Sequence, residues 1–197
     1  NYPEITILES TRDNPSKNEC WHTDMTFLKN QPLCSILRSK ICPSKGGDTM
    51  WSSMTAAYES LSESMKNFLK NLTAEHDFCH GFKESIAEPG GRERLKDAIK
   101  NNPPVVHPVI RTHPITKRKA IFVNPLFTTK INELSKSESD ALLEFLYSYS
   151  ITPEFTCRFS WTPNSIAIWD NRCTLHKPIN DYFPEHRLLE RITVDGD

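Results

Sequence analysis

The residues with the clearest chemical potential lie in the tetrapeptide Trp21-His22-Thr23-Asp24, where one residue separates an imidazole from a carboxylate. In an extended chain, side chains two residues apart point to the same side. His22 and Asp24 would then supply two thirds of a 2-His-1-carboxylate site. Such a site holds Fe(II) by one face and leaves positions open for oxygen and a substrate. Alone, the His-x-Asp pattern is frequent by chance and also fits a surface turn.

A third ligand has to come from a distant segment that folds back beside the first two. His176 fits, because it follows an apolar run and a turn that together indicate the start of a new strand. His76 and His80 are four residues apart, but the residues around them do not form an amphipathic helix. We expect structural or indirect roles for these two histidines. Structural roles are also expected for His107 and His113, which precede prolines.

The closing segment 187–194 alternates as a strand, which places Arg187 and Arg191 on one face, with Cα atoms roughly 13 Å apart. If this face lay in water, Glu190 on the opposite face would point into the core. Burying unpaired charge is costly, so we expect both arginines to face inward and to bind anions. Arginine holds a carboxylate through paired charge-assisted bonds. Two such residues indicate two anionic groups in one pocket, an acid cosubstrate and the anionic end of the primary substrate.

Short strands with helices between them make up the rest of the predicted fold. Strands are predicted at 5–8, 34–40, 49–51, 155–161, 165–169, 173–176 and 187–194. Helices are predicted over 54–72, 92–100 and 135–149, and a hairpin over 105–111 and 120–124. This order of elements favours a mainly β fold with inserted helices, either a β-sandwich or a jelly roll.

Length, charge and cysteine content limit the class of protein. A chain of 197 residues is long enough for one domain with a full hydrophobic core. The net charge of −1 gives no electrostatic case for nucleic acid or an anionic membrane as partner, and no apolar run approaches a membrane span. The six cysteines form no C-x-x-C or zinc-ribbon spacing, so we expect free thiols in a reducing cytoplasm.

Five blocks of sequence occur in a specific order. They are Trp21-His22-Thr23-Asp24, Gly46-Gly47-Asp48-Thr49, Trp169-Asp170-Asn171-Arg172, Thr174-Leu175-His176, and Arg187 with Arg191. Together they resemble the taurine dioxygenase family of Fe(II)- and 2-oxoglutarate-dependent oxygenases, over essentially the whole chain. The resemblance implies a double-stranded β-helix, a cupin-like jelly roll. It also implies that 1–197 forms a single dioxygenase domain that lacks the family's N-terminal segment.

The same resemblance implies a role for nine residues. The expected Fe(II) ligands are His22, Asp24 and His176. The expected 2-oxoglutarate-binding residues are Thr49 and Arg187. The expected substrate-binding residues are Asn18, Phe82, Phe127 and Arg191. No catalytic residue is expected beyond the metal ligands. Gly81 departs from the taurine enzymes, which carry a serine there that touches the substrate.

The implied reaction uses O2 and 2-oxoglutarate to hydroxylate a small anionic sulfonate, taurine in the first place. It releases sulfite, with succinate and CO2 as coproducts. The alternative is the same chemistry on an alkyl sulfate ester or another small acid, because Arg191 calls for an anion in either case. The family resemblance also implies a homo-oligomer.

Two other classes of protein are alternatives to an oxygenase. A non-enzymatic binding domain on the same barrel would not require all three metal ligands together with Arg187. A zinc hydrolase could use two histidines and an aspartate, but Arg187 and Thr49 would then have no function. Iron content measured against zinc content separates the second class from an oxygenase.

Overall fold

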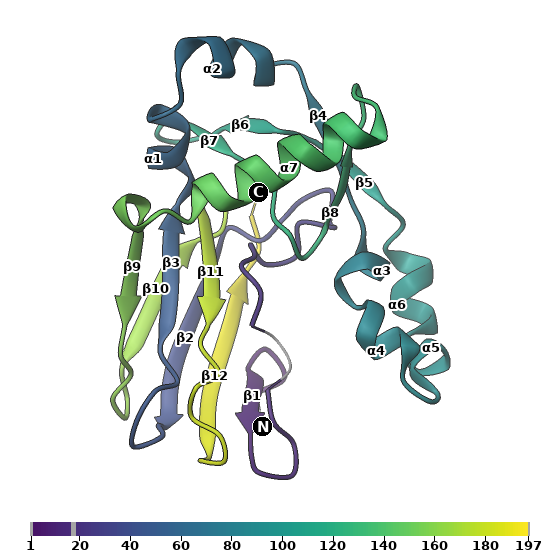
Figure 1. The fold of residues 1–197 in the computed structure, drawn as a ribbon. Coiled ribbons are helices and arrows are strands. Elements are labelled where there is room, and N and C mark those ends of the chain that lie inside the picture. Colours follow the sequence, from purple (N-terminus) through teal and green to yellow (C-terminus); the bar gives the residue numbers. More distant parts are fainter. Residues whose placement is uncertain (1, 17–18, 197) are drawn as a thin grey trace.

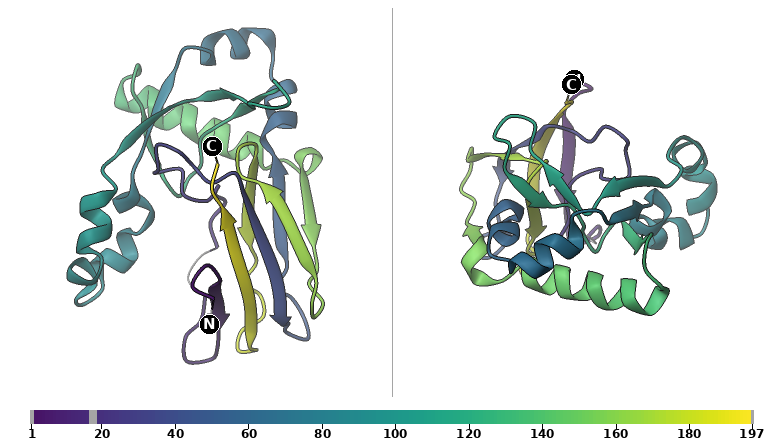
Figure 2. Two further views of the ribbon diagram at one scale, coloured as in Figure 1. Left: turned by 180° about the vertical axis from the view of Figure 1, so that it is seen from behind. Right: turned by 90° about the horizontal axis from the view of Figure 1, so that it is seen from above.

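Two antiparallel sheets pack face to face. The computed structural model describes residues 2–16 and 19–196. The larger sheet has the order β1 (Thr6–Ser10), β12 (Arg187–Val194), β2 (Cys34–Ile41) and β10 (Ile166–Asp170). The smaller sheet has the order β11 (Thr174–Pro178), β3 (Thr49–Ser53) and β9 (Thr156–Phe159). In Figure 1 the smaller sheet stands in front of the larger one, and Figure 2 shows the same pair from behind.

Aromatic side chains fill the space between the two sheets. The rings of Trp51 on β3 and Trp169 on β10 have centroids 5.5 Å apart. Trp161 and Leu189 are buried in the same cluster. Indole rings bring a large apolar area and one N–H group that needs a partner, so this interior is apolar and can still donate hydrogen bonds.

The alternation of β12 decides which charges face this interior. Arg187 and Leu189 are only 8% and 1% exposed, and Arg191 on the same face is partly buried. Glu190 points the other way and forms an ion pair with Arg38 of β2 at 3.7 Å. The prediction that both arginines face inward is therefore confirmed.

The remaining elements lie mainly at one end of the sandwich and beside it (Figure 1). Two further sheets have the orders β5 (Val105–Pro108), β4 (Thr73–His76), β8 (Thr128–Ile131), and β6 (Ile110–Thr112), β7 (Lys119–Ile121). The helices are α1 (Met54–Glu59), α2 (Glu63–Leu69), α3 (Phe78–Gly81), α4 (Lys83–Ala87), α5 (Gly91–Arg94), α6 (Lys96–Asn101), α7 (Lys136–Ser150) and the short η1 (Pro153–Phe155). The largest hydrophobic cluster joins α1 and α7 to β4 and β8 of the first of these further sheets and to β7 of the second.

The predicted helix over 54–72 is wrong in one respect, because it is two helices. The chain leaves the helix at Ser60, and the side chain of Ser62 accepts a hydrogen bond from Met65 N, which caps α2. Serine is a favoured N-cap residue because its hydroxyl replaces a missing backbone partner. The apolar stripe survives the break at Leu61 and Leu69, which are buried.

The other expected helices and the expected hairpin agree with the structure to different degrees. The helix expected over 92–100 is divided at Leu95 into α5 and α6. The expected hairpin is limited to β6 and β7, because residues 105–108 pair with β4 instead. The segment 74–82, for which no helix was expected, contains α3 after β4. The helix expected over 135–149 is confirmed as α7, with a capping box at its start.

No helix in the described part of the chain is long and apolar enough to cross a membrane. All six cysteines fall within the described residues, and none of them forms a disulfide bond. The cytoplasmic location expected from the cysteines stays a prediction.

Replacing Leu146 by Ala should destabilise the fold, because this fully buried side chain packs α7 onto the core. We expect a loss of about 2–5 kcal/mol in the free energy of unfolding, measured by urea titration. Glu144→Ala, on the exposed side of the same helix, should change it by less than about 0.5 kcal/mol. Equal losses in the two variants would show that α7 is not packed as described.

Candidate active site

A backbone contact joins the two histidines expected to bind metal. His22 N–H donates to the carbonyl oxygen of His176 at 2.9 Å, and His176 N–H donates to the carbonyl oxygen of His22 at 2.7 Å. Reciprocal bonds of this kind define a directly opposed antiparallel pair, whose side chains share one face. The hydroxyl of Thr23 adds a hydrogen bond to the carbonyl of Thr174 at 2.8 Å. The segment around His22 is thereby fastened to β11.

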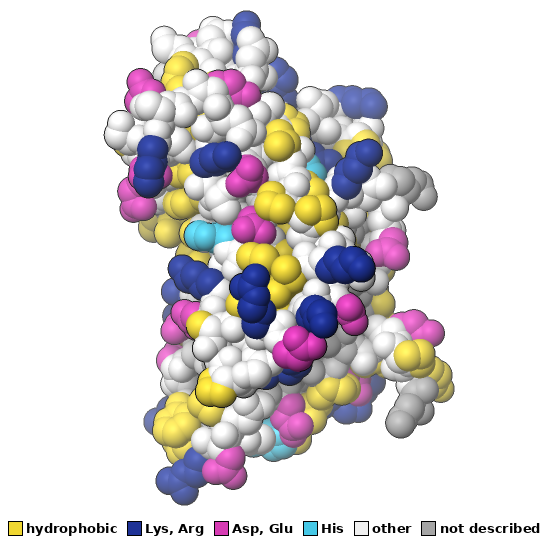
Figure 3. Space-filling model, turned by 90° about the vertical axis from the view of Figure 1, so that its right-hand side faces the viewer, with side chains coloured by type: hydrophobic (Ala, Val, Ile, Leu, Met, Phe, Trp, Pro, Cys, Tyr) yellow, Lys and Arg dark blue, Asp and Glu magenta, His cyan; other side chains and the backbone are white. Residues whose placement is uncertain are grey.

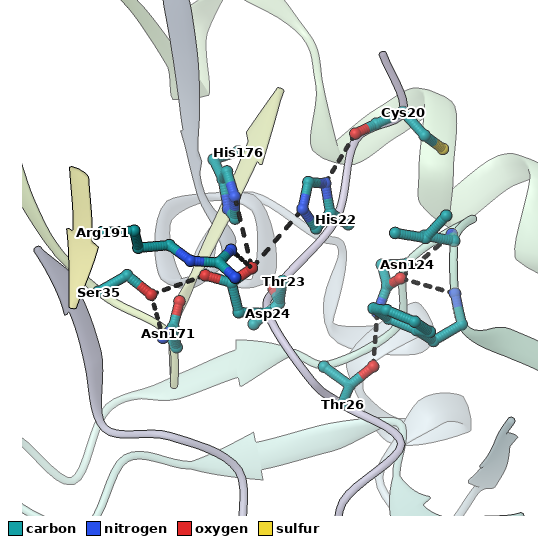
Figure 4. A network of polar contacts seen from close by, with 12 residues as sticks. Cys20, His22, Thr23, Asp24, Thr26, Ser35, Asn124, Asn171, His176 and Arg191 are labelled. Carbon is teal, nitrogen blue, oxygen red and sulfur yellow. Dashed lines mark hydrogen bonds and ion pairs between the residues drawn. The ribbon is translucent and has the colours of Figure 1, made fainter. Parts of the chain in front are cut away.

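The side chains of His22, Asp24 and His176 converge on one point (Figure 4). The Nε2 atoms of the two histidines lie 3.7 and 3.8 Å from Oδ1 of Asp24. One potential ligand atom from each residue lies within 4.8 Å of the others, and all three residues are buried. This spacing suits one small cation, because such ions sit about 2.0–2.2 Å from nitrogen and oxygen ligands.

Burial and charge set the protonation of these three groups. Burial lowers the pKa of both histidines, and with help from His22 the pKa of His176 falls to about 3. Burial alone would raise the pKa of Asp24. The neighbouring imidazoles, Arg191 and the hydroxyl of Ser35 outweigh it and lower this pKa to about 2. Two neutral imidazoles and one carboxylate are the forms that a metal cation requires.

The orientation of His22 is fixed by its other ring nitrogen. Nδ1 lies 2.8 Å from the carbonyl oxygen of Cys20. A carbonyl can only accept, so Nδ1 carries the proton and Nε2 keeps its lone pair for a metal. The ring of His176 packs against Trp169, with centroids 4.8 Å apart.

Arg187 and Thr49 lie on the inner faces of β12 and β3. The Nε and Nη2 atoms of Arg187 are buried and have no hydrogen-bond partner in the described part of the chain. A guanidinium stays charged in proteins, and an unpaired buried charge is costly. The hydroxyl of Thr49 accepts from Trp161 Nε1 at 3.0 Å, so its own proton remains available for a ligand. Both residues therefore fit an anionic ligand such as the carboxylate of 2-oxoglutarate.

The absence of a side chain at Gly47 leaves room for the side chain of Arg187. The backbone of Gly47 has φ +70°, and a Cβ atom there would lie 3.3 Å from Arg187 Nε and 2.8 Å from Pro43 Cγ. A larger residue would be strained and would also press on the guanidinium. This explains one glycine of the Gly46-Gly47-Asp48-Thr49 block.

A cavity of about 700 Å³ adjoins the three converging side chains. Its lining includes His22, Asp24 and Arg191 together with the aromatic residues Phe27, Phe78, Phe82 and Phe127. The rings of Phe78 and Phe82 are stacked, with centroids 4.5 Å apart. Figure 3 views the side on which α3 to α6 lie, where hydrophobic side chains gather among side chains of both charges. The cavity thus combines a broad apolar wall with the cationic side chains of Arg191 and Lys83 and the acidic side chains of Glu19 and Glu84.

Gly81 shapes the apolar wall of this cavity. A Cβ atom on Gly81 would lie 2.3 Å from Cε1 of Phe127, closer than any contact allows. Phe127 can occupy its present position only because residue 81 has no side chain. The departure from the serine of the taurine enzymes therefore has a steric consequence.

The structure places most of the expected substrate residues at the cavity. Phe82, Phe127 and Arg191 line it, whereas Asn18 lies outside the described residues. One contact was not expected from the sequence: Nη1 of Arg191 lies 3.4 Å from Oδ1 of Asp24. This arginine therefore contacts an expected metal ligand as well as the cavity.

Other cavity-lining and ligand-contacting residues were missed by sequence reasoning. His80 lines the cavity, although an indirect or structural role was expected for it. Phe27 and Phe78 line it as well, and their apolar character alone could not distinguish them from core residues. Ser35 contacts Asp24, but a serine in an alternating strand carries no signal of its own.

A second group of potential metal ligands, His113, Asp170 and Cys173, has its hydrogen bonds satisfied without an ion. Nδ1 of His113 accepts from two backbone N–H groups, so Nε2 carries the proton and donates to Asp170 at 3.0 Å. The same carboxylate accepts from Arg172. These contacts agree with the structural role expected for His113.

Two further histidines anchor the segment that carries His22 and Asp24. Nε2 of His107 lies 3.0 Å from the carbonyl oxygens of both Thr26 and Leu28. Nδ1 of His76 lies 2.9 Å from the hydroxyl of Thr26, which also accepts from Asn124 at 3.0 Å. Burial, then His107 and Arg111, lower the pKa of His76 to about 3, so it is neutral. Both histidines have the structural role expected for them.

The family described as taurine catabolism dioxygenase TauD, TfdA family matches residues 1–193. An alkylsulfatase of Acinetobacter baylyi is 37% identical, over 97% of this chain and 61% of its own length. An alpha-ketoglutarate-dependent sulfonate dioxygenase of Saccharomyces cerevisiae is 34% identical, over 99% of this chain and 46% of its own length.

Comparison of structures gives a similar result. A crystal structure of a taurine dioxygenase from Burkholderia xenovorans superimposes with a TM-score of 0.81 and 34% identity. The match covers 99% of this chain and 65% of that one. The chain thus spans about half to two thirds of the length of the relatives described here.

Replacing His176 by Ala should abolish tight binding of a divalent cation, because it removes one of three converging ligands. We expect Mn(II) to bind at least roughly 100-fold more weakly, measured by electron paramagnetic resonance of free Mn(II), with the circular dichroism spectrum preserved. His113→Ala removes a histidine of the second group and should leave Mn(II) affinity unchanged. If His113→Ala weakened Mn(II) binding and His176→Ala did not, the metal would be bound by the second group, and the assignment to His22, Asp24 and His176 would be wrong.

Proposed function

Because the chain belongs to the TauD, TfdA family of taurine catabolism dioxygenases, we propose that it forms the catalytic part of an Fe(II)- and 2-oxoglutarate-dependent oxygenase. Its substrate would be a small anionic sulfonate, taurine in the first place. One observation carries the proposal: three buried potential cation ligands share an interior with Arg187, whose buried Nε and Nη2 have no hydrogen-bond partner among the described residues. A cation site alone fits many chemistries, but a cation site in the same interior as buried arginine donors that lack a partner among the described residues supports binding of a metal-bound acid.

The residues divide the work of binding in this proposal. His22, Asp24 and His176 hold Fe(II) from one side. Arg187 and Thr49 bind the carboxylate of 2-oxoglutarate that is remote from the metal. When bound, iron, 2-oxoglutarate and O2 supply the oxidation, which hydroxylates the substrate and yields succinate and CO2.

Arg191 orients the substrate. Its position 3.4 Å from Asp24 places a positive charge at the border between the metal site and the cavity. A sulfonate paired with this guanidinium leaves the adjacent carbon close to the metal side of the cavity. The aromatic wall excludes water from that carbon, which protects the oxidation from side reactions. Hydroxylation of taurine at this carbon would release sulfite.

The finer description of the fold belongs to the same proposal. We propose that the two facing sheets form a double-stranded β-helix, a cupin-like jelly roll, within a single domain. Support comes from their antiparallel pairing and from strand orders that join distant segments, such as β12 between β1 and β2. The homo-oligomer expected from the family stays a prediction.

A second candidate substrate is an alkyl sulfate ester, and the aromatic wall favours it. Phe127 fills the space that the serine of taurine enzymes would require, so the wall is apolar at that point. An alkyl chain gains free energy from such a surface, about 25 cal/mol per Å² of apolar area buried. The amino group of taurine gains nothing from it. The alkylsulfatase among the relatives is consistent with this second candidate.

Turnover assays of the full-length protein should separate the two substrates. With Fe(II), 2-oxoglutarate and O2, taurine should stimulate succinate formation, with one sulfite released per succinate. Hexyl sulfate serves as the second substrate, and stimulation by it with equal release of sulfate would favour the sulfate ester. No succinate with either compound or with other small acids, in protein that has bound iron, would contradict the proposed oxygenase.

Separate substitutions of the two inward arginines should affect different ligands. Arg187→Ala should raise the KM for 2-oxoglutarate by roughly 10- to 100-fold, because it removes a charge-assisted interaction of about 1.5–3 kcal/mol. Arg191→Ala should raise the KM for the primary substrate more than that for 2-oxoglutarate. Arg38→Ala, on the outer face of β2, is the control and should change neither value. Equal shifts for both ligands in both variants would refute the separate roles.

A further inference from the structure

We propose that Ser35 and Asn171 position Asp24 so that only one of its carboxylate oxygens is available to a metal ion. The hydroxyl of Ser35 lies 2.6 Å from Oδ2 of Asp24, and Nδ2 of Asn171 lies 3.0 Å from the same hydroxyl (Figure 4). The inference rests on the proposed function, because Asp24 is an iron ligand only within it. It assigns a positioning role to two residues that the resemblance left without one.

The direction of each hydrogen bond follows from the groups involved. An ionised carboxylate can only accept, so the single proton of Ser35 is donated to Asp24. The hydroxyl oxygen then has only lone pairs left, and it accepts from the amide N–H of Asn171. If the amide were rotated, its oxygen would face an oxygen with no proton to give. The Asn171–Ser35–Asp24 relay therefore has a single consistent arrangement.

Both positioning residues are held rigidly. Ser35 is fully buried in the middle of the larger sheet, where it lies opposite Trp169 of β10 and Thr193 of β12. Asn171 is also fully buried. Its backbone N–H donates to Leu33 at 3.0 Å, and its carbonyl accepts from a glutamine side chain at 2.8 Å. The hydrogen bonds of the relay thus hold the Asp24 carboxylate in a fixed position relative to the larger sheet.

The relay determines how Asp24 can bind an ion. Oδ2 is occupied by Ser35, whereas Oδ1 faces the two histidine Nε2 atoms at 3.7 and 3.8 Å, with Nη1 of Arg191 at the longer hydrogen-bond distance of 3.4 Å. A carboxylate can ligate a metal through one oxygen or through both. With Oδ2 occupied, Asp24 supplies one ligand atom, and the positions needed by the cosubstrate and substrate stay open. Without the relay, the carboxylate is free to turn and take up one of those positions.

Ser35→Ala in the full-length protein tests the relay, with Mn(II) affinity as the measured quantity. We expect Mn(II) to bind roughly 10- to 100-fold more weakly, the effect typical of losing a group that orients a metal ligand. 2-Oxoglutarate should also bind more weakly to the Mn(II)-loaded variant, measured by calorimetry. Ser39→Ala is a matched control, because Ser39 lies on the same strand, is equally buried, and donates its hydroxyl to the carbonyl of Thr162 at 2.5 Å. The Ser39→Ala variant should lose about as much folding stability as Ser35→Ala, but it should bind Mn(II) and 2-oxoglutarate as the wild type does.

The outcomes distinguish the relay from the proposed function. If the wild-type protein does not bind Mn(II), the proposed metal site fails. If the wild type binds Mn(II) and Ser35→Ala binds it as tightly as Ser39→Ala, the relay is refuted and the metal site stands. Asn171→Ala breaks the relay without touching Ser35 and covers the case in which Ser35→Ala does not fold. Mn(II) affinity in this variant equal to that of Ser39→Ala would refute the relay as well.

Discussion

The reciprocal pair of backbone hydrogen bonds between His22 and His176 is the constraint on which the site depends. It sets the two imidazoles side by side before any ion is considered, and the extended chain brings Asp24 to the same side. The bonds join segments about 150 residues apart, as the neighbouring contact between Thr23 and Thr174 shows. The two segments can meet only if the elements between them fold correctly, so the geometry of the site depends on the whole sandwich.

Charges inside the sandwich are the second constraint. Asp24 and Arg187 are buried and Arg191 is partly buried in an interior that also holds tryptophan and leucine side chains. Asp24 has its partners within the protein, whereas Arg187 keeps buried donors without one among the described residues. Leaving such a group unpaired lowers the stability of the empty protein. If an anion binds there as proposed, these donors would gain hydrogen bonds, so part of the binding free energy would come from removing the cost of burying Arg187 without a partner.

Much of the site and part of the fold could be predicted from sequence. The inward face of β12 followed from alternation, since Glu190 would otherwise have been buried without a cation. The division of the helix at Ser60 could not be predicted, because serine fits both a helix and a cap. The pairing of residues 105–108 with β4 connects segments about 30 residues apart and leaves no local pattern. Ser35 and Asn171 were missed because their importance lies in a contact with Asp24, which only the folded chain creates.

The wide separation of the metal ligands along the chain has a consequence for the lifetime of the protein. An ion that needs His22, Asp24 and His176 together can bind only the folded chain, because in the unfolded chain these residues are far apart. Occupancy then adds to stability by mass action, about 2.7 kcal/mol when the free ion is at 100 times its dissociation constant. Cellular proteases attack the unfolded fraction. If the proposed site binds an ion, the bound form would therefore be less exposed to proteolysis than the form without it.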